Sequence, residues 1–333
     1  MSINVESLAA GIHPRSENLV RVTRDYDRGR TNETALNESF AMDIEDLVKV
    51  QVNSGFSFVC DGQLRWQDFI RPFSESVSGL ENGADLSRWF DTNTFYKKPT
   101  VTNRLSTDGT FLGKSRYSNW VSRDKTKRAI ALPGPFTLTN LVDDQYYQSR
   151  DELVHDFSKV LKEVIQRLAS TGDTTIQINE PSLVYRYGDS AIKDPKALEI
   201  FLSAFKEHLS NLNANIILHT YFGDCSTILK DLVSLPGAST IGIDFTQTSL
   251  ENISAIEFDG KRLGCGCVDA RSSLIESSEW ISSFCSEAYS KLKPSGIVIL
   301  PSSDLKYLPR TYSDRKLISM GDASKLLLTR ISN

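Results

Sequence analysis

Several polar side chains that could move a proton or bind a ligand stand directly after short apolar runs. His219 and Tyr221 follow one such run, Asp244 ends another, and Ser303 follows a third. Imidazole and carboxylate groups act as general bases and as metal ligands. A histidine at the end of a strand is also often a hydrogen-bonded structural residue, and Asp244 could equally cap a helix. The residue types alone leave both interpretations open.

Three further polar positions have the same placement. Gln63 follows the turn Asp61-Gly62, Arg271 follows Asp269, and Asn179-Glu180 precedes Pro181. Because a carboxylate in a tight turn can accept backbone N–H groups, we expect Glu180 to tie loops together. Loops are polar in any protein, so this pattern favours a functional pocket without establishing one.

The cysteines exclude some chemistry. There are five, which is too few and an odd number for a disulfide framework, so we expect reduced thiols. Cys265 and Cys267 are separated by one residue and lack a second pair, so we expect them in the core or in a pocket wall rather than in a zinc knuckle. The sequence contains neither a standard glycine-rich phosphate loop nor a G-x-S-x-G elbow.

The elements that must position these residues are alternating strands and helices. Apolar or β-branched runs predict strands at 8–12, 56–60, 128–132, 174–178, 215–219, 239–244, 261–266 and 296–300. Apolar residues at helical spacing predict helices at 152–169, 195–212, 226–235 and 277–292. About eight strands joined by right-handed crossovers predict an α/β protein with a (β/α)8 TIM barrel. A doubly wound open sheet is the competing fold.

Two expectations follow for the arrangement of the chain. Parallel strands in a barrel end on one face, so His219, Asp244 and Ser303 should converge there. Residues 93–114 depart from the strand–helix order and predict a β-hairpin excursion at the mouth of the barrel, with a turn at Asp108-Gly109. No composition shift suggests a linker, so we expect residues 1–333 to form a single domain.

Composition excludes several classes of protein. Apolar residues make up 40% and charged residues 24% of the 333 residues, which excludes a disordered chain. The 38 basic and 42 acidic side chains give a net charge of −4, which argues against a nucleic-acid partner. No apolar run reaches the ~18 residues of a membrane span, and no signal peptide begins the sequence, so we expect a cytoplasmic protein with no membrane partner.

An ordered series of short strings carries a family resemblance. The strings are His13-Pro14-Arg15-Ser16, Asp61-Gly62-Gln63-Leu64-Arg65-Trp66, Arg88-Trp89-Phe90-Asp91-Thr92-Asn93, Leu132-Pro133-Gly134-Pro135, Ile178-Asn179-Glu180-Pro181, His219-Thr220-Tyr221-Phe222 and Pro301-Ser302-Ser303-Asp304. Together they resemble cobalamin-independent methionine synthase over nearly the whole chain. That family has two related barrels. The resemblance implies that the C-terminal one uses zinc to activate homocysteine for methyl transfer from methyltetrahydrofolate.

The resemblance also implies that this chain lacks the zinc chemistry. The family's metal ligands are a His-x-Cys pair, a Glu and a second Cys. Tyr221 and Ser303 stand where the two cysteines belong, and Asp244 stands in place of the Glu. His219 is kept, while Arg271 occupies the position of the family's acid histidine and cannot shuttle a proton. Hydroxyl groups are poor substitutes for zinc thiolates, so we expect no cofactor and no bound zinc.

These expectations favour one function and leave others open. The chain resembles the non-zinc N-terminal barrel, which implies a folate tail or another small anionic ligand near Arg15, Arg88, Tyr96 and Glu180. It would work with a separate zinc-bearing barrel. The alternative is a self-contained methyltransferase with a different methyl donor, or with a weak metal site made of His219 and Asp244. A different reaction on the same fold is a third reading.

Overall fold

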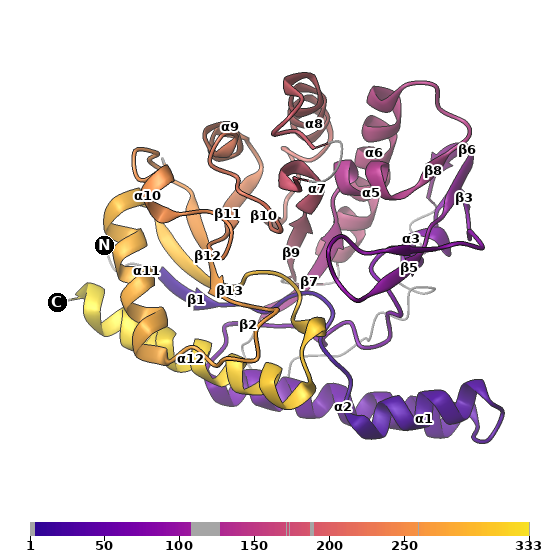
Figure 1. Cartoon of the computed structure of the whole chain (residues 1–333), viewed down its shortest axis with the longest axis horizontal. Coiled ribbons are helices and arrows are strands. Elements are labelled where there is room, and N and C mark those ends of the chain that lie inside the picture. Colours follow the sequence, from indigo (N-terminus) through magenta and orange to yellow (C-terminus); the bar gives the residue numbers. More distant parts are fainter. Residues whose placement is uncertain are drawn as a thin grey trace.

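A parallel sheet that curls into a barrel forms the centre of the molecule (Figure 1). The structure is a computed structural model that describes residues 4–107, 127–170, 172, 174–186, 190–258 and 260–332. Eight strands pair in the order β1-β13-β12-β11-β10-β9-β7-β2. They are β1 (Asn4–Ser7), β2 (Phe58–Val59), β7 (Lys127–Pro133), β9 (Thr174–Asn179), β10 (Asn215–Thr220), β11 (Ala238–Asp244), β12 (Arg262–Val268) and β13 (Gly296–Pro301).

The strand order distinguishes a barrel from an open sheet. From β2 to β13 each of these strands pairs with the one that follows it in the sequence, and β13 pairs with β1, with Asn4 opposite Gly296. A doubly wound sheet would reverse direction at an internal strand. The backbone N–H of His13 donates to the carbonyl of Gly62 at 2.8 Å, which joins the loops that follow β1 and β2. The predicted (β/α)8 barrel is therefore confirmed.

Helices cover the outside of the barrel. The long ones are α1 (Glu17–Asp27), α2 (Glu33–Ser54), α6 (Arg150–Ser170), α8 (Pro195–His208), α11 (Ser278–Leu292) and α12 (Arg310–Ser332). The short ones are α3 (Arg71–Ser74), α5 (Pro135–Leu141), α7 (Pro181–Val184), α9 (Leu229–Ser234) and α10 (Leu250–Ile253), with the 3-10 turn η1 (Leu305–Tyr307). The predicted helices correspond to α6, α8, α9 and α11. None of the described helices is long and apolar enough to cross a membrane.

The helices α2 and α12 were not predicted, although α2 carries recognisable ends. The Asn32 side chain accepts from the N–H of Ala35, and Gly55 ends the helix with a φ of 87°. These are the N-cap and the left-handed glycine expected at helix ends. In Figure 1 α2 and α12 run along the same side of the barrel, and the two helices contact each other.

The first strand lies earlier than expected. The prediction of a strand at 8–12 is wrong, because the paired residues of β1 are Asn4–Ser7, in register with Gly296 to Ile299. Past Leu8 the chain leaves the sheet, and Gly11 has a φ of 109°, which an extended strand does not allow. Residues 8–12 are buried, except for the half-buried Ala9, in the loop that follows β1.

The predicted β excursion is present, and its described strands pair with other strands of the same region. β5 (Phe95–Lys97) pairs with β4 (Leu86–Arg88) in antiparallel orientation. β6 (Thr100–Ser106) pairs with β3 (Ser78–Glu81) in antiparallel orientation and with β8 (Asp143–Asp144) in parallel orientation. Strands β5 and β6 therefore do not form a hairpin with each other. Residues 108–114, including the predicted turn at Asp108-Gly109, lie outside the described residues. In Figure 1 β3, β6 and β8 stand beside the barrel on the side of α6.

The short strand β2 depends on a buried glutamine for its outer hydrogen bonds. Gln51 on α2 donates from Nε2 to the carbonyl of Cys60 at 2.8 Å and accepts from the N–H of Cys60 at 3.0 Å. The side chain is 1% exposed. An amide that pairs with both backbone groups of one residue substitutes for a missing neighbouring strand.

We predict that Gln51→Met lowers the free energy of unfolding by about 2–4 kcal/mol, because it leaves the N–H and carbonyl of Cys60 buried without partners. Urea denaturation measures this loss. Gln145→Met is the matched control at an exposed position and should change the stability by less than about 0.5 kcal/mol. Equal effects at both positions would contradict the proposed role of Gln51.

Candidate functional site

Polar side chains from several strand ends meet at the mouth of the barrel. Asn179 ends β9, His219 lies near the end of β10, and Ser303 follows β13. The rings of His219 and Tyr221 are 5.3 Å apart, and Tyr221 contacts Phe222, whose ring is 6.1 Å from that of Tyr307. We call the group the mouth cluster; its members are Asn179, His219, Tyr221, Ser303, Asp304 and Tyr307.

Polar atoms of the mouth cluster are buried without hydrogen-bond partners. They are Asn179 Nδ2, His219 Nε2, Tyr221 OH, Ser303 Oγ, both carboxylate oxygens of Asp304 and Tyr307 OH. A buried polar group that makes no hydrogen bond costs about 1–3 kcal/mol, and folded proteins seldom leave such groups unmatched. Donors and acceptors that converge from different strands therefore define a binding site for a small polar ligand or for ordered water.

The hydrogen bonds of Gln177 set the tautomer of His219. The Gln177 Nε2 group donates to Asn179 Oδ1 at 2.8 Å and lies 3.3 Å from His219 Nδ1. An amide nitrogen only donates, so Nδ1 must accept and the ring proton must reside on Nε2. Burial lowers the pKa of His219 to about 3, which keeps the ring neutral. His219 thus presents an N–H donor to the mouth cluster.

Asp304 is the acidic member of the mouth cluster, and the sequence analysis did not identify it as a site residue. Its carboxylate lies against Gly11, where a Cβ would come within 2.1 Å of Oδ1. Lys306 Nζ lies 4.0 Å from Oδ2. Burial raises the pKa of Asp304 to about 6, and the charge of Lys306 opposes that rise. The clue in the sequence was an acid directly after Ser303 at a predicted strand end.

Asp244 lies at the same end of the barrel, but its carboxylate already accepts hydrogen bonds from the protein. Its carboxylate accepts from the N–H of Phe222 at 3.1 Å and from the N–H and hydroxyl of Thr246 at 2.9 and 2.6 Å. Burial raises its pKa to about 6. His219, Asp244 and Ser303 all follow parallel strands at one end, as expected. The role of Asp244, however, is to connect the loops after β10 and β11.

The side chains of Glu180 and Gln63 are likewise hydrogen-bonded to backbone groups of neighbouring segments. Glu180 accepts from the N–H of Phe136 at 2.9 Å and from the N–H and hydroxyl of Thr137 at 2.8 and 2.6 Å. Burial raises the pKa of Glu180 to about 7. Gln63 pairs with both the N–H and the carbonyl of Ala131, at 2.9 and 3.0 Å. Glu180 therefore ties loops together as expected, and neither side chain projects a free polar group.

Backbone strain is concentrated around the mouth. Gln63, Phe90 and Phe222 have φ values of 45°, 48° and 68°. Residues other than glycine rarely adopt these left-handed conformations, and such residues cluster at binding sites, where the surrounding structure holds them. Phe90 and Phe222 contact each other with ring centres 5.6 Å apart. The strained segments thus bring an aromatic wall up to the mouth cluster.

Arg15 lines a cation-rich cavity beside the mouth. Its guanidinium donates to the carbonyls of Leu64 and Trp66 at 2.9 and 3.3 Å. The cavity measures about 830 Å³. Its charged lining residues are Arg15, Arg21, Arg24, Lys306, Arg310, Glu17 and Asp68. This excess of positive charge favours an anionic ligand.

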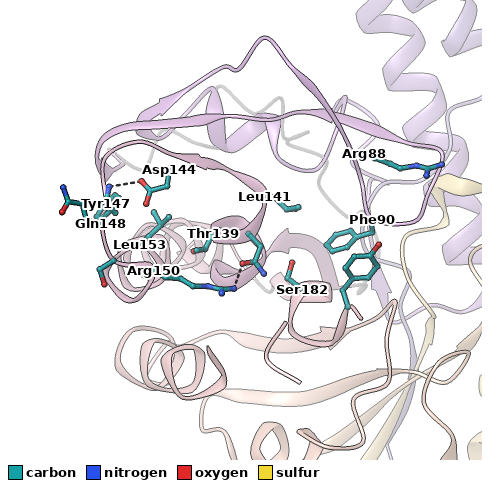
Figure 2. Close-up of a pocket in the computed structure, with 13 residues that line it drawn as sticks. Arg88, Phe90, Thr139, Leu141, Asp144, Tyr147, Gln148, Arg150, Leu153 and Ser182 are labelled. Atoms are coloured by element: carbon teal, nitrogen blue, oxygen red, sulfur yellow. Dashed lines mark hydrogen bonds between the residues drawn. The ribbon is translucent and has the colours of Figure 1, made fainter. Parts of the chain in front are cut away.

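Arg88 lines a second cavity, of about 540 Å³, shown in Figure 2. Arg88 and Phe90 lie at one end of it and Tyr147 and Gln148 at the other. Arg88 donates to the carbonyl of Thr92 at 2.8 Å and to Asn93 Oδ1 at 3.2 Å. The structure therefore places Arg15 and Arg88 in different cavities.

The remaining candidates divide between the mouth and the scaffold. Arg271 lies over the ring of Phe222 with its guanidinium carbon 5.2 Å from the ring centre, so it borders the mouth. Tyr96 is buried and donates its hydroxyl to the carbonyl of Leu141 at 3.0 Å. Tyr96 thus anchors the excursion to the barrel.

The residues at the mouth do not fit a zinc ion. His219 presents an N–H group to the mouth rather than a lone pair. The Asp244 carboxylate already accepts three hydrogen bonds. Burial raises the pKa of Tyr221 well above its usual value, so its hydroxyl stays protonated. Zinc requires deprotonated ligands. Within the described residues, the groups of three potential ligand atoms within 4.8 Å of one another are Cys265, Cys267 and Cys285, and His155, Glu207 and His208. The first group lies on β12 and α11 and the second on α6 and α8, and neither includes a member of the mouth cluster.

All five cysteines are buried, and the expected burial of Cys265 and Cys267 is confirmed. Cys265 and Cys267 on β12 point toward Cys285 on α11, and each of the three is free of disulfide bonds. Burial raises the pKa of Cys225 to about 11, which keeps that thiol protonated and unreactive.

The fold is a (β/α)8 barrel, and the mouth cluster is a candidate ligand site at the carboxyl ends of its strands. A family model described as "Cobalamin-independent synthase, N-terminal domain" matches residues 79–284. The chain belongs to this family, which confirms the resemblance and its bias toward the N-terminal barrel.

Related proteins support this assignment over nearly the full length of the chain. A methionine synthase of Sulfolobus acidocaldarius is 24% identical over 93% of this chain and 88% of its own length. One from Saccharolobus islandicus is 26% identical over 95% of this chain and 93% of its own. A B12-independent methionine synthase from Shewanella sp. W3-18-1, solved in complex with selenomethionine, has a TM-score of 0.75 at 17% identity, covering 98% of both chains. The last comparison supports the fold.

We predict that His219 stays neutral, with its proton on Nε2, between pH 8 and pH 5. Its pKa of about 3 lies below this range because the buried ring cannot be solvated when charged. Imidazole nitrogen resonances, assigned with His219→Gln, report both the tautomer and the charge. Gln177→Leu serves as a comparison that should weaken the tautomer preference. A titration within this range, or a proton on Nδ1, would contradict the assignment.

Proposed function

We propose that this chain is the non-zinc partner in a cobalamin-independent methionine synthase reaction. In this role the mouth cluster binds a small polar ligand, and a separate zinc-bearing barrel of the same family activates the sulfur of homocysteine. The observation that carries the proposal is the mouth cluster itself, which offers unpaired donors and acceptors at the position where the family's thiolate ligands are replaced by Tyr221 and Ser303.

The chemistry of the mouth cluster supports ligand binding rather than sulfur activation. A thiol with a pKa near ~8.5 is mostly protonated at neutral pH, and a bound zinc ion is the means by which it is deprotonated. The neutral His219 and the phenols of Tyr221 and Tyr307 cannot replace a Lewis acid bonded to sulfur. They can hydrogen-bond to carboxylate, ammonium or amide groups of a ligand, and Asp304 supplies the negative charge that an ammonium group would match.

The surrounding cations support an anionic ligand next to the mouth. Arg15 and its neighbours line the cavity of about 830 Å³, and Arg271 borders the mouth beside Phe222. A glutamate tail of a folate or the carboxylate of an amino acid has the charge that this surface favours. Arg88 contributes a further cation to the cavity in Figure 2, whose volume of about 540 Å³ suits a ligand of modest size.

We predict that the purified chain alone does not form methionine from homocysteine and polyglutamylated methyltetrahydrofolate, with or without added zinc. Turnover should appear only when a zinc-bearing barrel of the family is added, and it should exceed that of the zinc-bearing barrel alone. Zinc-dependent turnover by this chain alone, abolished by His219→Ala, would overturn the proposal in favour of a self-contained methyltransferase.

We also predict that Arg15→Gln raises the KM for the polyglutamylated donor in the mixture by about tenfold or more, because it removes a charge-assisted contact. The KM for the monoglutamyl donor should change much less, which separates loss of tail binding from general damage to the fold. Arg30→Gln removes an exposed arginine elsewhere and is the control. An equal rise for both donors would argue against a tail-binding role for Arg15.

A further inference from the structure

A second cluster of metal-binding side chains lies outside the barrel, where helices α6 and α8 pack together. His155 belongs to α6, and Glu207 and His208 are the last two residues of α8. The three side chains bring one ligand atom each to a common point, within 4.8 Å of one another. The function proposed for the barrel mouth does not use this cluster.

The distances within the cluster match those around a metal ion. His155 Nδ1 is 3.2 Å from His208 Nε2. Glu207 Oε2 lies 3.3 Å from the first nitrogen, and Glu207 Oε1 lies 3.4 Å from the second. Zinc binds nitrogen and oxygen at about 2.0–2.2 Å in tetrahedral geometry, so neighbouring ligand atoms are separated by about 3.3–3.5 Å. The nitrogen–nitrogen and nitrogen–oxygen separations are therefore close to those between neighbouring ligands of one ion, and one ligand atom of each side chain lies within 4.8 Å of the others.

A fourth residue orients one of the imidazoles. Asp151, one turn before His155 on α6, has its Oδ1 atom 3.4 Å from His155 Nε2. A carboxylate beside one imidazole nitrogen holds the ring proton there and leaves the lone pair on the other nitrogen. In His155 that other nitrogen is Nδ1, which faces His208 and Glu207.

Exposure allows an ion to enter and leaves room for a fourth ligand. Glu207 and Asp151 are each 60% exposed, while the His155 and His208 side chains are 20% and 8% exposed. A cavity of about 860 Å³ lined by His155 and Asp151 adjoins the cluster. Water from this cavity can complete the coordination. By contrast, Cys265, Cys267 and Cys285 are all fully buried.

The charges around the cluster suit a divalent cation. Glu207 and Asp151 together supply two negative charges to balance it. Lys159 is held by Asp156 at 2.7 Å, and Asp156 also contacts Arg104 on β6 at 3.4 Å.

We propose that His155, Glu207 and His208 form a binding site for a divalent transition-metal ion, with zinc as the ion that fits best. Two imidazoles and one carboxylate are ligands of intermediate softness, which favours zinc and its neighbours over magnesium or calcium. The ion would link α6 to α8 and stabilise the outer layer of the barrel. This site is distinct from the metal position that the family resemblance implies at the mouth.

The experiment is a titration of the metal-free full-length chain with cobalt(II), followed by displacement with zinc(II). Visible absorption should report one tetrahedral or five-coordinate cobalt per chain, and zinc at 100 times its dissociation constant should raise the Tm by several degrees.

Matched variants identify the ligands. Glu207→Gln, at an exposed position that tolerates change, should weaken cobalt binding at least tenfold, and His155→Ala should abolish the spectrum. Glu199→Gln on the same helix is the control for charge and should leave binding unchanged. Absence of binding at millimolar metal would overturn the proposal. So would binding that survives both Glu207→Gln and His155→Ala, or binding that depends on Cys285 instead.

Discussion

Removal from water is the constraint on which the barrel mouth depends. Closing the parallel sheet brings the ends of β9, β10, β11 and β13 to one rim, and the loops above them exclude solvent from the polar side chains there. Once buried, each polar atom must find a partner in the protein or in whatever fills the site. The low pKa of His219 and the raised pKa values of Asp304 and Glu180 share this origin.

The polar side chains at the rim are of two sorts: some are hydrogen-bonded to the surrounding backbone, and others have no hydrogen-bond partner within the protein. Asp244 and Glu180 each accept three hydrogen bonds from neighbouring loops, which fixes the backbone around the mouth. Asp304 is an equally buried acid, yet it accepts none. Its position depends on Gly11 in a loop far away in the sequence, because any larger residue there would occupy the same space. Because Asp244 and Glu180 hold the surrounding backbone in place, Asp304 can remain buried without a hydrogen-bond partner.

Periodicity and resemblance predicted the fold well and the site in part. The continuous apolar strands, the amphipathic helices and the strand-end positions of Asn179, His219 and Ser303 could all be read from local sequence. The position of the first strand could not be predicted from local sequence, because Asn4–Ser7 is short and its place is determined by pairing with β13. The sequence also could not show that Asp244 is fully hydrogen-bonded while Asp304 has no hydrogen-bond partner. That difference depends on tertiary contacts with Thr246 and Gly11. The proximity of His155 and His208 depends on the packing of α6 against α8, which are separated in the sequence by β9 and α7.

The pairing of β1 with β13 also has a consequence for how the chain acquires its structure. The first four residues of the sheet can form their ladder only with Gly296 to Ile299, near the other end of the chain. During synthesis, therefore, the segment that forms β1 must wait until β13 has been made. Contacts between such remote segments carry a large loop-closure entropy and slow the final step of folding. The seam between β1 and β13 is thus the place where we expect a nascent chain to remain open longest and to need protection from aggregation.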